Sequence, residues 1–325
     1  AAKTSAGGND PGLPSVETLM SRFVQQQEIA DPIVLEIIDR PDPVAGAGEV
    51  RVRVHAAGLN PVDWKIATHP QAAAAFGVTA PAGFGNDFAG VVDEVGDGVT
   101  GFAVGDRVFG SARGRAVADH IVLTPDVSNL AHTPEGLDDE TAATLWIATR
   151  TADAALSAVG VTAGDTVLIG GAAGGVGVIT VQLAVAAGAT VIATASPANH
   201  EFLKGLGAIP VAYGDGLVEA VRAVAGDGVT AAIDLHGTDT AVAAAALGVP
   251  GERIATIAGG PTPPYGAIAT GGAASAPDAP ARIAQLIADG AVTLPIEASF
   301  PVERIDEAIA LQRGGHVRGK VVVTL

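Results

Sequence analysis

The sequence predicts an α/β protein in which a β-rich region precedes a doubly wound parallel sheet. Residues 49–61 alternate polar and apolar side chains, as a half-buried strand does. From residue 165 onward, short apolar runs alternate with helical patterns of about ten residues, which is typical of parallel βαβ units. The glycine-rich stretch GAAGGVGVIT (171–180) directly follows the first of these runs.

The composition fits a folded protein of two domains. The chain has 325 residues, of which 48% are hydrophobic, enough for two cores of ordinary size. Its formal net charge of -17 and its lack of any Lys/Arg run argue against a nucleic-acid partner. The absence of cysteine excludes disulfides, thiolate catalysis and Cys-ligated zinc. No apolar run is long enough to span a membrane, so we expect no membrane partner and a cytoplasmic location.

Residues 1–19 differ in composition and pattern from the rest of the chain. They are rich in Gly, Pro and Ser, show no periodic pattern, and precede Met20, the only methionine. We interpret them as a cloning remnant ahead of a native start at Met20; a natural disordered arm is the alternative.

Residues 20–125 read as strands and turns. The β-type runs are IVLEIIDRP, EVRVRVHAAGLNP, FAGVVDEVG and DRVFG. Near residue 138 the pattern becomes helical, with acids in the first turn of LDDETAATLWIATRTADAALSA. We expect one domain to comprise 20–145 and 275–325, with HVRGKVVVTL as a strand that rejoins it, and residues 146–274 to form the other.

The second domain is predicted as a series of strands and helices. In chain order, these segments are DTVLIGG, VGVITVQLAVAAG, TVIATAS, NHEFLKGLG, IPVAY, LVEAVRAVAG, AAIDLHG, DTAVAAAALG and RIATIAGG. A further helix, APARIAQLIADG, follows YGAIATGG.

The glycine loop has the context of a dinucleotide-binding turn. Its register is Ala172-x-Gly174-x-x-Gly177, between a strand and a helix that begins near Val176. Gly174 would let the backbone approach a pyrophosphate, and Gly177 would let the helix pack closely on the strand. The helix N-terminus would then face the phosphates. A purely structural turn in a glycine-rich protein is the alternative.

The next strand carries the signal for the cofactor. It ends in Thr194-Ala195-Ser196, with no carboxylate before Glu201. An acid at this point would bind the ribose 2′-hydroxyl of NAD and repel a 2′-phosphate, so its absence favours NADP(H). Ser196, His200 and Lys204 are candidate donors to that phosphate, although Lys204 could equally be a solvated helix residue.

Taken together, the segments 48–66, 85–110, 166–184 and 315–325 resemble the medium-chain dehydrogenase/reductase superfamily, in its zinc-free NADPH quinone oxidoreductase (zeta-crystallin-like) branch. The resemblance implies a GroES-like catalytic domain with a Rossmann NADP-binding domain inserted before its last segment. It also implies NADPH dependence, a cleft between the domains and a homodimer.

The resemblance also carries over site residues. It places Asn60, Asp63 and Trp64 at the nicotinamide and substrate cleft, where family members often have another residue in place of Trp64. For Asp63 a structural cap after Pro61 is the alternative. The implied cofactor contacts are Thr151, Gly174, Gly175, Val176, Ser196, Tyr213, Ala258 and Gly259, with Ser196 and Tyr213 at the 2′-phosphate and 256–260 and GHVRGK near the nicotinamide.

The sequence predicts no metal site. Zinc-dependent relatives carry Gly-His-Glu where this chain has Gly85-Asn86-Asp87, and its seven histidines are scattered. Without a metal, alcohol oxidation lacks stabilisation of the alkoxide, whereas quinones and conjugated enones spread the developing charge.

We therefore expect an enzyme that transfers hydride from NADPH to a small quinone or α,β-unsaturated carbonyl. The alternatives are an enoyl reductase acting on a natural-product or acyl-thioester intermediate, and a nucleotide-binding protein without turnover.

Overall fold

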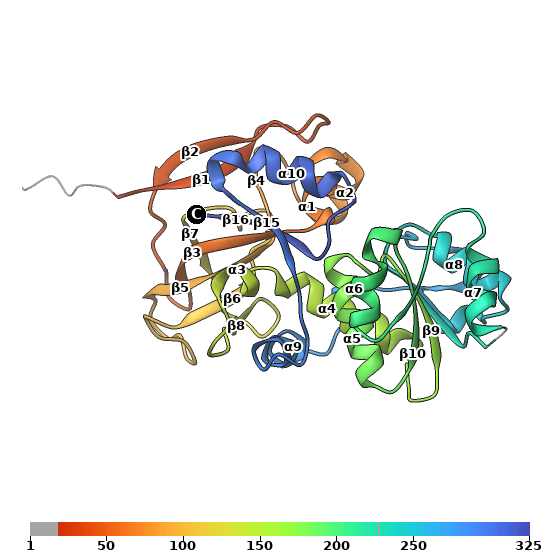
Figure 1. Ribbon diagram of the computed structural model, residues 1–325. Helices are drawn as coiled ribbons and strands as arrows, with labels where there is room; N and C mark the ends of the chain where they lie inside the picture. The colour runs from red at the N-terminus through yellow and green to blue at the C-terminus, as the bar shows by residue number, and fades with distance from the viewer. Residues whose placement is uncertain (1–18, 227) are drawn as a thin grey trace, which may run out of the picture.

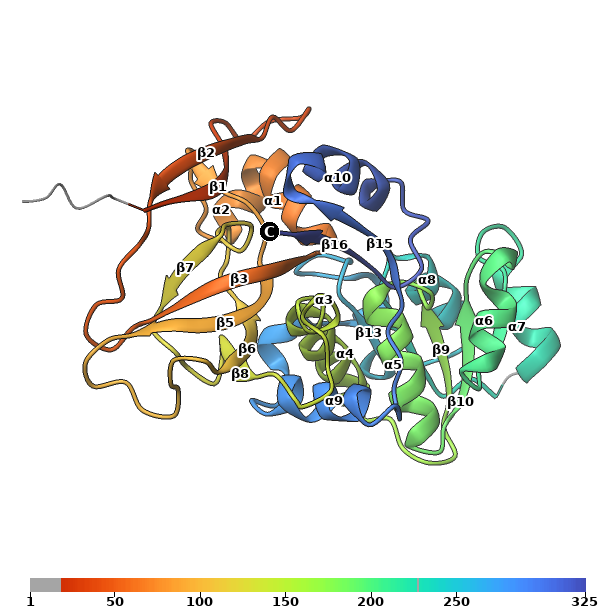
Figure 2. The same cartoon turned by 60° about the vertical axis from the view of Figure 1, so that its left-hand side comes forward.

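The computed structural model describes residues 19–226 and 228–325, which form two lobes (Figure 1). The N-terminal and C-terminal parts of the chain share one lobe, and the middle of the chain forms the other (Figures 1 and 2). The predictions for the segment before Leu19 lie outside the described residues.

The first lobe is built on a seven-stranded sheet with β3 at its centre. Along β3, Val50, Val52 and Val54 are buried while the residues between them are not, which confirms the half-buried strand that the alternation predicts. The strands run in the order β15 (Ile296–Pro301), β16 (Lys320–Thr324), β3 (Val50–Leu59), β5 (Asp87–Val95), β6 (Arg107–Ser111) and β8 (Leu130–His132), with β7 (His120–Leu123) also paired to β3.

A small second sheet covers this lobe, and the end of the chain completes the large one. The small sheet consists of β2 (Glu36–Pro41), β1 (Met20–Gln26) and β4 (Ala82–Gly83). Strand β16 pairs antiparallel with β3, which confirms the predicted return of HVRGKVVVTL to the first domain. Figure 2 shows β16 and β15 beside β3.

The second lobe is a parallel sheet with helices on both sides. Its order is β11 (Ile209–Val211), β10 (Thr190–Thr194), β9 (Thr166–Gly170), β12 (Ala231–Asp234), β13 (Ile254–Thr256) and β14 (Ile268–Ala269), and every pair of neighbours is parallel. Its covering helices include α5 (Gly175–Ala186), α6 (His200–Gly205), α7 (Leu217–Ala225) and α8 (Asp239–Ala246). The strand order reverses at β9, which is the switch point where such sheets bind ligands. The predicted doubly wound α/β fold is confirmed.

Two helices join the lobes. Helix α4 (Leu145–Val159) contacts strands of both sheets, and α9 (Ala279–Ala288) packs against α4 and β8. The domain boundaries that we expect at 145/146 and 274/275 stay predictions, because these helices belong to the contact between the lobes.

The structure differs from the sequence prediction in its helices. The single helix predicted from residue 138 is two helices, α3 (Asp139–Ala142) and α4, because β3 crosses the break at close range. A Cβ on Gly58 would overlap the carbonyl oxygen of Ala143. The sequence prediction also lacked α1 (Pro61–Thr68), α2 (Pro70–Ala75) and α10 (Ile305–Arg313).

Candidate active site

The loop after β9 has the geometry of a phosphate-binding turn. Gly171 has φ 68°, a conformation that favours glycine. A Cβ on Gly177 would overlap the carbonyl oxygen of Gly171, so this glycine allows the close approach of α5 to the loop. A Cβ on Gly174 would meet only that same oxygen, at 3.5 Å. Gly174 therefore leaves open space at the helix N-terminus, which fits the pyrophosphate of a dinucleotide.

The C-terminal strand brings the first lobe against this loop. Gly319 forms a parallel bridge with Gly174, and its N–H donates to the carbonyl oxygen of Ala173 at 2.8 Å. The stem of Lys320 lies so close to Gly175 that a Cβ there would overlap it. The loop of one lobe and the first residue of β16 are therefore in direct contact.

Lys320 belongs to a buried polar cluster. The cluster consists of Asn60, Asp63, Asn86, Asp87 and Lys320, none of which is more than 5% exposed. Asn60 and Asp63 come from the start of α1, Asn86 and Asp87 from the start of β5, and Lys320 from the start of β16. Charged side chains this deeply buried must be paired, so the cluster is a functional-site candidate on physical grounds.

The Asn60 amide links the two charges of opposite sign. Its Oδ1 accepts from Lys320 Nζ at 2.6 Å, and its Nδ2 donates to Asp87 Oδ2 at 3.0 Å. The same Asp87 oxygen accepts the backbone N–H of Ile147 in α4 at 3.1 Å. Both ends of the Asn60 amide are therefore occupied within the protein, which leaves it to orient Lys320 and Asp87.

Asp63 has a structural role as well as a place in the cluster. Its Oδ2 accepts the backbone N–H of Asn60 at 2.7 Å, which caps the first turn of α1 as the structural interpretation predicts. Its Oδ1 accepts from the side-chain amide of Asn86. The capping carboxyl is nevertheless buried and faces the charge of Asp87.

Burial controls the ionisation of the cluster. It raises the pKa of Asp63 to about 7, helped by the charge of Asp87 and opposed by the hydrogen bonds from Asn60 and Asn86 and by the charge of Lys320. It raises the pKa of Asp87 to about 6, against the charge of Lys320 and the hydrogen bonds from Ile147 and Asn60. Burial also lowers the pKa of Lys320, against the attraction of both carboxylates. The cluster can therefore take up or release a proton near neutral pH.

The structure does not bring Trp64 to this cluster. Its indole N–H donates to Gln312 Oε1 of α10 at 2.6 Å, and the Arg313 guanidinium lies over its ring. Trp64 thus packs between α1 and α10, because its side chain leaves the helix on a different side from Asp63. The prediction of a catalytic role for Trp64 has no support in this geometry.

Two predicted 2′-phosphate residues lie at the end of β10. Ser196 precedes the short 3-10 turn Pro197–Asn199, and a ring nitrogen of His200 lies 3.3 Å from the carbonyl oxygen of Ala195. Lys204 instead pairs with Glu201 at 2.6 Å and is exposed. This agrees with the alternative that Lys204 is a solvated helix residue. Tyr213 follows β11 and is 56% exposed.

Arg318 also lies in this region, although no pattern in the sequence marks it for a contact there. Its Nε donates to Asn199 Oδ1 at 2.8 Å, its Nη2 donates to the carbonyl oxygen of Ala198 at 3.3 Å, and its guanidinium lies over the Phe202 ring. It therefore places a positive charge beside the turn that follows β10. Arg318 was visible only as part of GHVRGK, which we expected near the nicotinamide.

The predicted residues of the nicotinamide end lie near the carboxyl ends of β13 and β14. The N–H groups of Ala258 and Gly259 donate to Thr256 Oγ1 at 3.2 and 3.0 Å. Thr151 of α4 is 7% exposed and lies beside Gly272, which follows β14. Thr270 lies between β14 and Gly272, and its buried hydroxyl has no hydrogen-bond partner among the described residues. No pattern in the sequence marks Thr270.

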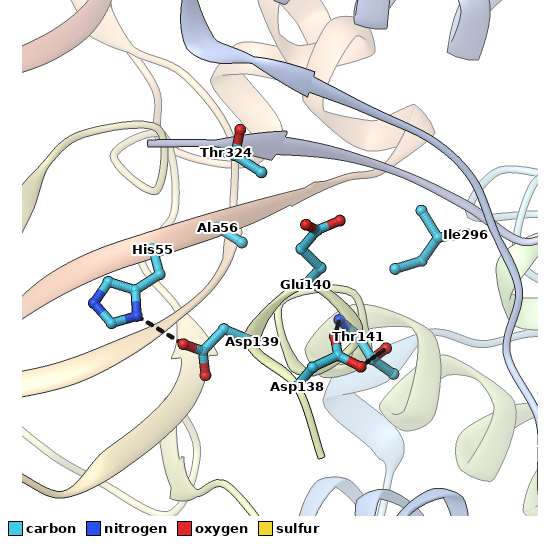
Figure 3. Close-up of a pocket in the computed structure, with 8 residues that line it drawn as sticks. All are labelled: His55, Ala56, Asp138, Asp139, Glu140, Thr141, Ile296 and Thr324. Carbon is cyan, nitrogen blue, oxygen red and sulfur yellow. Dashed lines mark hydrogen bonds and ion pairs between the residues drawn. The ribbon is translucent and has the colours of Figure 1, made fainter. Parts of the chain in front are cut away.

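A separate hollow of about 530 Å³ lies on the first lobe between β3, β16 and α3 (Figure 3). Its polar side chains contact one another or neighbouring groups. His55 Nδ1 lies 2.7 Å from Asp139 Oδ2, Asp138 accepts the N–H of Thr141 as the cap of α3, and Glu140 accepts from Ser299. These side chains are therefore already engaged within the protein.

Within residues 19–226 and 228–325, no group of three or more His, Asp or Glu side chains is placed to hold a metal ion. No helix of the described part of the chain is long and apolar enough to cross a membrane.

Two family descriptions match the chain. Residues 46–123 match "Alcohol dehydrogenase GroES-like domain", and residues 206–323 match "Zinc-binding dehydrogenase". The second description covers a segment without cysteine, like the rest of the chain.

Curated relatives match part of the chain. Erythronolide synthase EryA2 of Saccharopolyspora erythraea is 41% identical over 207 residues, covering 61% of this chain and 5% of that protein. The quinone oxidoreductase of Rattus norvegicus is 36% identical over 180 residues, covering 54% of this chain and 53% of that enzyme. The match thus spans about half the length of the rat enzyme and a small part of EryA2.

Solved structures match almost the whole chain. A protein described as NAD-dependent alcohol dehydrogenase is 30% identical with a TM-score of 0.80, covering 94% of this chain and 99% of that one. Mycobacterial Rv1454c in complex with NADPH is 27% identical with a TM-score of 0.80, covering 94% and 100%. The CurK enoyl reductase is 27% identical with a TM-score of 0.78, covering 94% and 99%.

Proposed function

Because the chain belongs to the medium-chain dehydrogenase/reductase superfamily, in its quinone oxidoreductase branch, we propose that it is an NADPH-dependent, zinc-independent reductase of quinones or α,β-unsaturated carbonyls. The observation that carries this proposal is the contact between the open glycine loop and the buried Lys320 cluster. It joins a dinucleotide-binding turn to a group of side chains that can hold a proton.

Each part of the site has a physical task. The loop at Gly174 and the N-terminus of α5 bind the pyrophosphate of the dinucleotide. The carboxyl ends of β13 and β14, with Thr151, hold its nicotinamide end. The bound nicotinamide supplies a hydride. The cluster around Asp63 holds a proton close to the loop.

Arg318 and the missing acid after β10 support NADPH over NADH. No carboxylate stands at Thr194–Ser196, and the Arg318 guanidinium lies against the following turn. A 2′-phosphate would meet a positive charge there rather than a negative one. The NADPH complex of Rv1454c shows that a protein of this fold binds that nucleotide.

Two variants test the nucleotide preference. Arg318→Ala should weaken NADPH binding about tenfold or more and leave NADH binding within about twofold, because only NADPH carries the phosphate. Ser196→Asp should act in the same direction through repulsion. Lys204→Ala is the control, since Lys204 already pairs with Glu201. Equal losses for both nucleotides in Arg318→Ala would contradict the assignment.

Asn86 and Asp87 support zinc independence. Their side chains are engaged with Asp63 and Asn60, so this segment serves the polar cluster. Turnover of an enone should survive dialysis against a chelator unchanged. Loss of turnover that added zinc restores would overturn the metal-free proposal.

An enoyl reductase for a natural-product or acyl-thioester intermediate is the second candidate. The matches to EryA2 and to the CurK enoyl reductase favour it. An acyl thioester conjugated to C=C should then be reduced with a much higher kcat/KM than a simple quinone. Tight NADPH binding without turnover of any acceptor would instead favour the third alternative, a binding protein.

We also propose that the protein is a homodimer in the cytoplasm, as the resemblance and composition lead us to expect. Light scattering on the purified chain tests the dimer: a mass twice 32.0 kDa is expected, and a monomeric mass would contradict it.

A further inference from the structure

A cavity of about 10 Å³ lies beside Asp63, between α1, β1 and the loop before β5. Its polar wall includes Gln26, Asp63 and Asn86, and glycines form part of the remainder. A void of this volume holds one water molecule when polar groups line it.

Gln26 brings a buried hydrogen-bond acceptor without a partner to the wall of this cavity. The residue ends β1 and is 2% exposed, and its Oε1 is buried without a hydrogen-bond partner among the described residues. Leaving such an acceptor unpaired costs about 1–3 kcal/mol. The Asn86 amide on the same wall already donates to Asp63 Oδ1. A donor for Gln26 must therefore come from a water in the cavity or from a proton on Asp63.

We propose that the Asp63 carboxyl holds the proton that the reduction consumes, and that one water seated against Gln26 Oε1 in this cavity accepts from its O–H group and keeps the acid neutral until that proton is used. The inference rests on the proposed reductase function and names the proton source within that site. Gln26 acts as a positioning residue, because it orients the water and does not itself give up a proton.

The surroundings favour a proton on Asp63 rather than a permanent charge. Burial raises the pKa of Asp63 to about 7, and the nearby charges that act on it are Asp87 and Lys320. Lys65 of α1 lies over the Trp64 ring, and Arg313 of α10 pairs with Asp31, so neither cation neutralises Asp63.

The transfer balances without a further reactant. The acceptor gains a hydride, and its electron pair moves onto the carbonyl oxygen. The O–H bond of Asp63 breaks, and its proton neutralises the reduced acceptor. Asp63 becomes a carboxylate opposite Lys320 and regains a proton from solvent before the next turnover.

The first test needs no turnover. In the full chain labelled with ¹³C at aspartate carboxyls, NMR should show a carboxyl that titrates near pH 7 and disappears in Asp63→Asn. Removing the acceptor in Gln26→Leu should lower that titration midpoint, because the water that accepts from the neutral acid loses the group that holds it in place. Gln26→Glu should raise it, because a second carboxyl opposes ionisation. Gln27→Leu is the matched control, since Gln27 is exposed on the next residue.

The second test is the pH profile of enone reduction. The alkaline limb of kcat should move in the same directions in the two Gln26 variants, and kcat of Asp63→Asn should fall about 100-fold or more. An Asp63 carboxyl that stays ionised from pH 5 to 8, or midpoints that the Gln26 variants do not move, would overturn the inference. Absent turnover in the wild type, with the titration intact, would overturn the proposed function instead.

Discussion

Asp63→Asn should make the protein more stable at pH 8, although it removes a charged residue with two hydrogen bonds. The pKa of Asp63 rises on folding from 3.8 to about 7 because the carboxyl is buried. A carboxyl of this kind stabilises the fold fully below about pH 4, and that stability is lost as the pH rises through 7. At ~1.4 kcal/mol per pH unit, the ionised group costs on the order of 4 kcal/mol at pH 8.

Because the ionisation of Asp63 is coupled to that of Asp87, the two carboxyls share this cost. We therefore expect the free energy of unfolding of the variant to exceed that of the wild type by about 2–4 kcal/mol at pH 8. Near pH 4, where Asp63 is protonated in the folded protein, the amide should be almost neutral. Urea unfolding at pH 4.5 and pH 8 measures the difference. The fluorescence of Trp64, on the same helix as Asp63, reports the local transition, and Trp146 against Phe109 reports the contact of α4 with the first sheet.

Asp31→Asn is the control of opposite sign. The Arg313 guanidinium lowers the pKa of Asp31, so that carboxylate stabilises the fold above pH 4, and neutralising it should reduce stability at pH 8. An Asp63→Asn variant that is less stable than the wild type at pH 8 would refute the reasoning, because Lys320 would then fully compensate the buried charge.

Four further substitutions probe other parts of the site. Lys320→Met should lower the free energy of unfolding by about 3–5 kcal/mol at pH 8 and by less at pH 5, because protonation removes the charge of the unpaired carboxylates. Equal losses at both pH values in urea unfolding would contradict this. Gly174→Ala should weaken dinucleotide binding, measured by calorimetry, and leave the melting temperature almost unchanged. Gly177→Ala should lower the melting temperature, because its Cβ would overlap the carbonyl oxygen of Gly171. The reverse pattern would show that the loop does not bind the dinucleotide in this way. Trp64→Phe should lose the bond to Gln312 and reduce stability by about 1 kcal/mol with kcat unchanged, and a large fall in kcat would restore a catalytic role for Trp64.

The parallel sheet was predictable because its signals are local. The run Thr166–Gly170, the glycines after it and the helix from Gly175 all follow from patterns within about 20 residues. Helix α1 was missed because it has only eight residues and begins in a proline-containing turn with no repeated apolar face.

The polar cluster was only half predictable. Asn60 and Asp63 emerged from the motif that they share, but Lys320 is 260 residues from Asn60 in sequence and meets it because β16 pairs with β3. Arg318 reaches the turn after β10 for the same reason. Gln26 gives no signal in the sequence, because its meaning depends on an acceptor left unpaired beside Asp63.

We propose that this chain reduces conjugated acceptors with NADPH and without a metal. The most direct test is the oxidation of NADPH, and separately NADH, by chelator-treated protein with a quinone, an enone and a simple aldehyde in turn. We expect turnover of the quinone or enone with a kcat/KM at least about tenfold higher for NADPH than for NADH, and no turnover with the aldehyde. Oxidation of simple alcohols with NAD, dependent on added zinc, would contradict it.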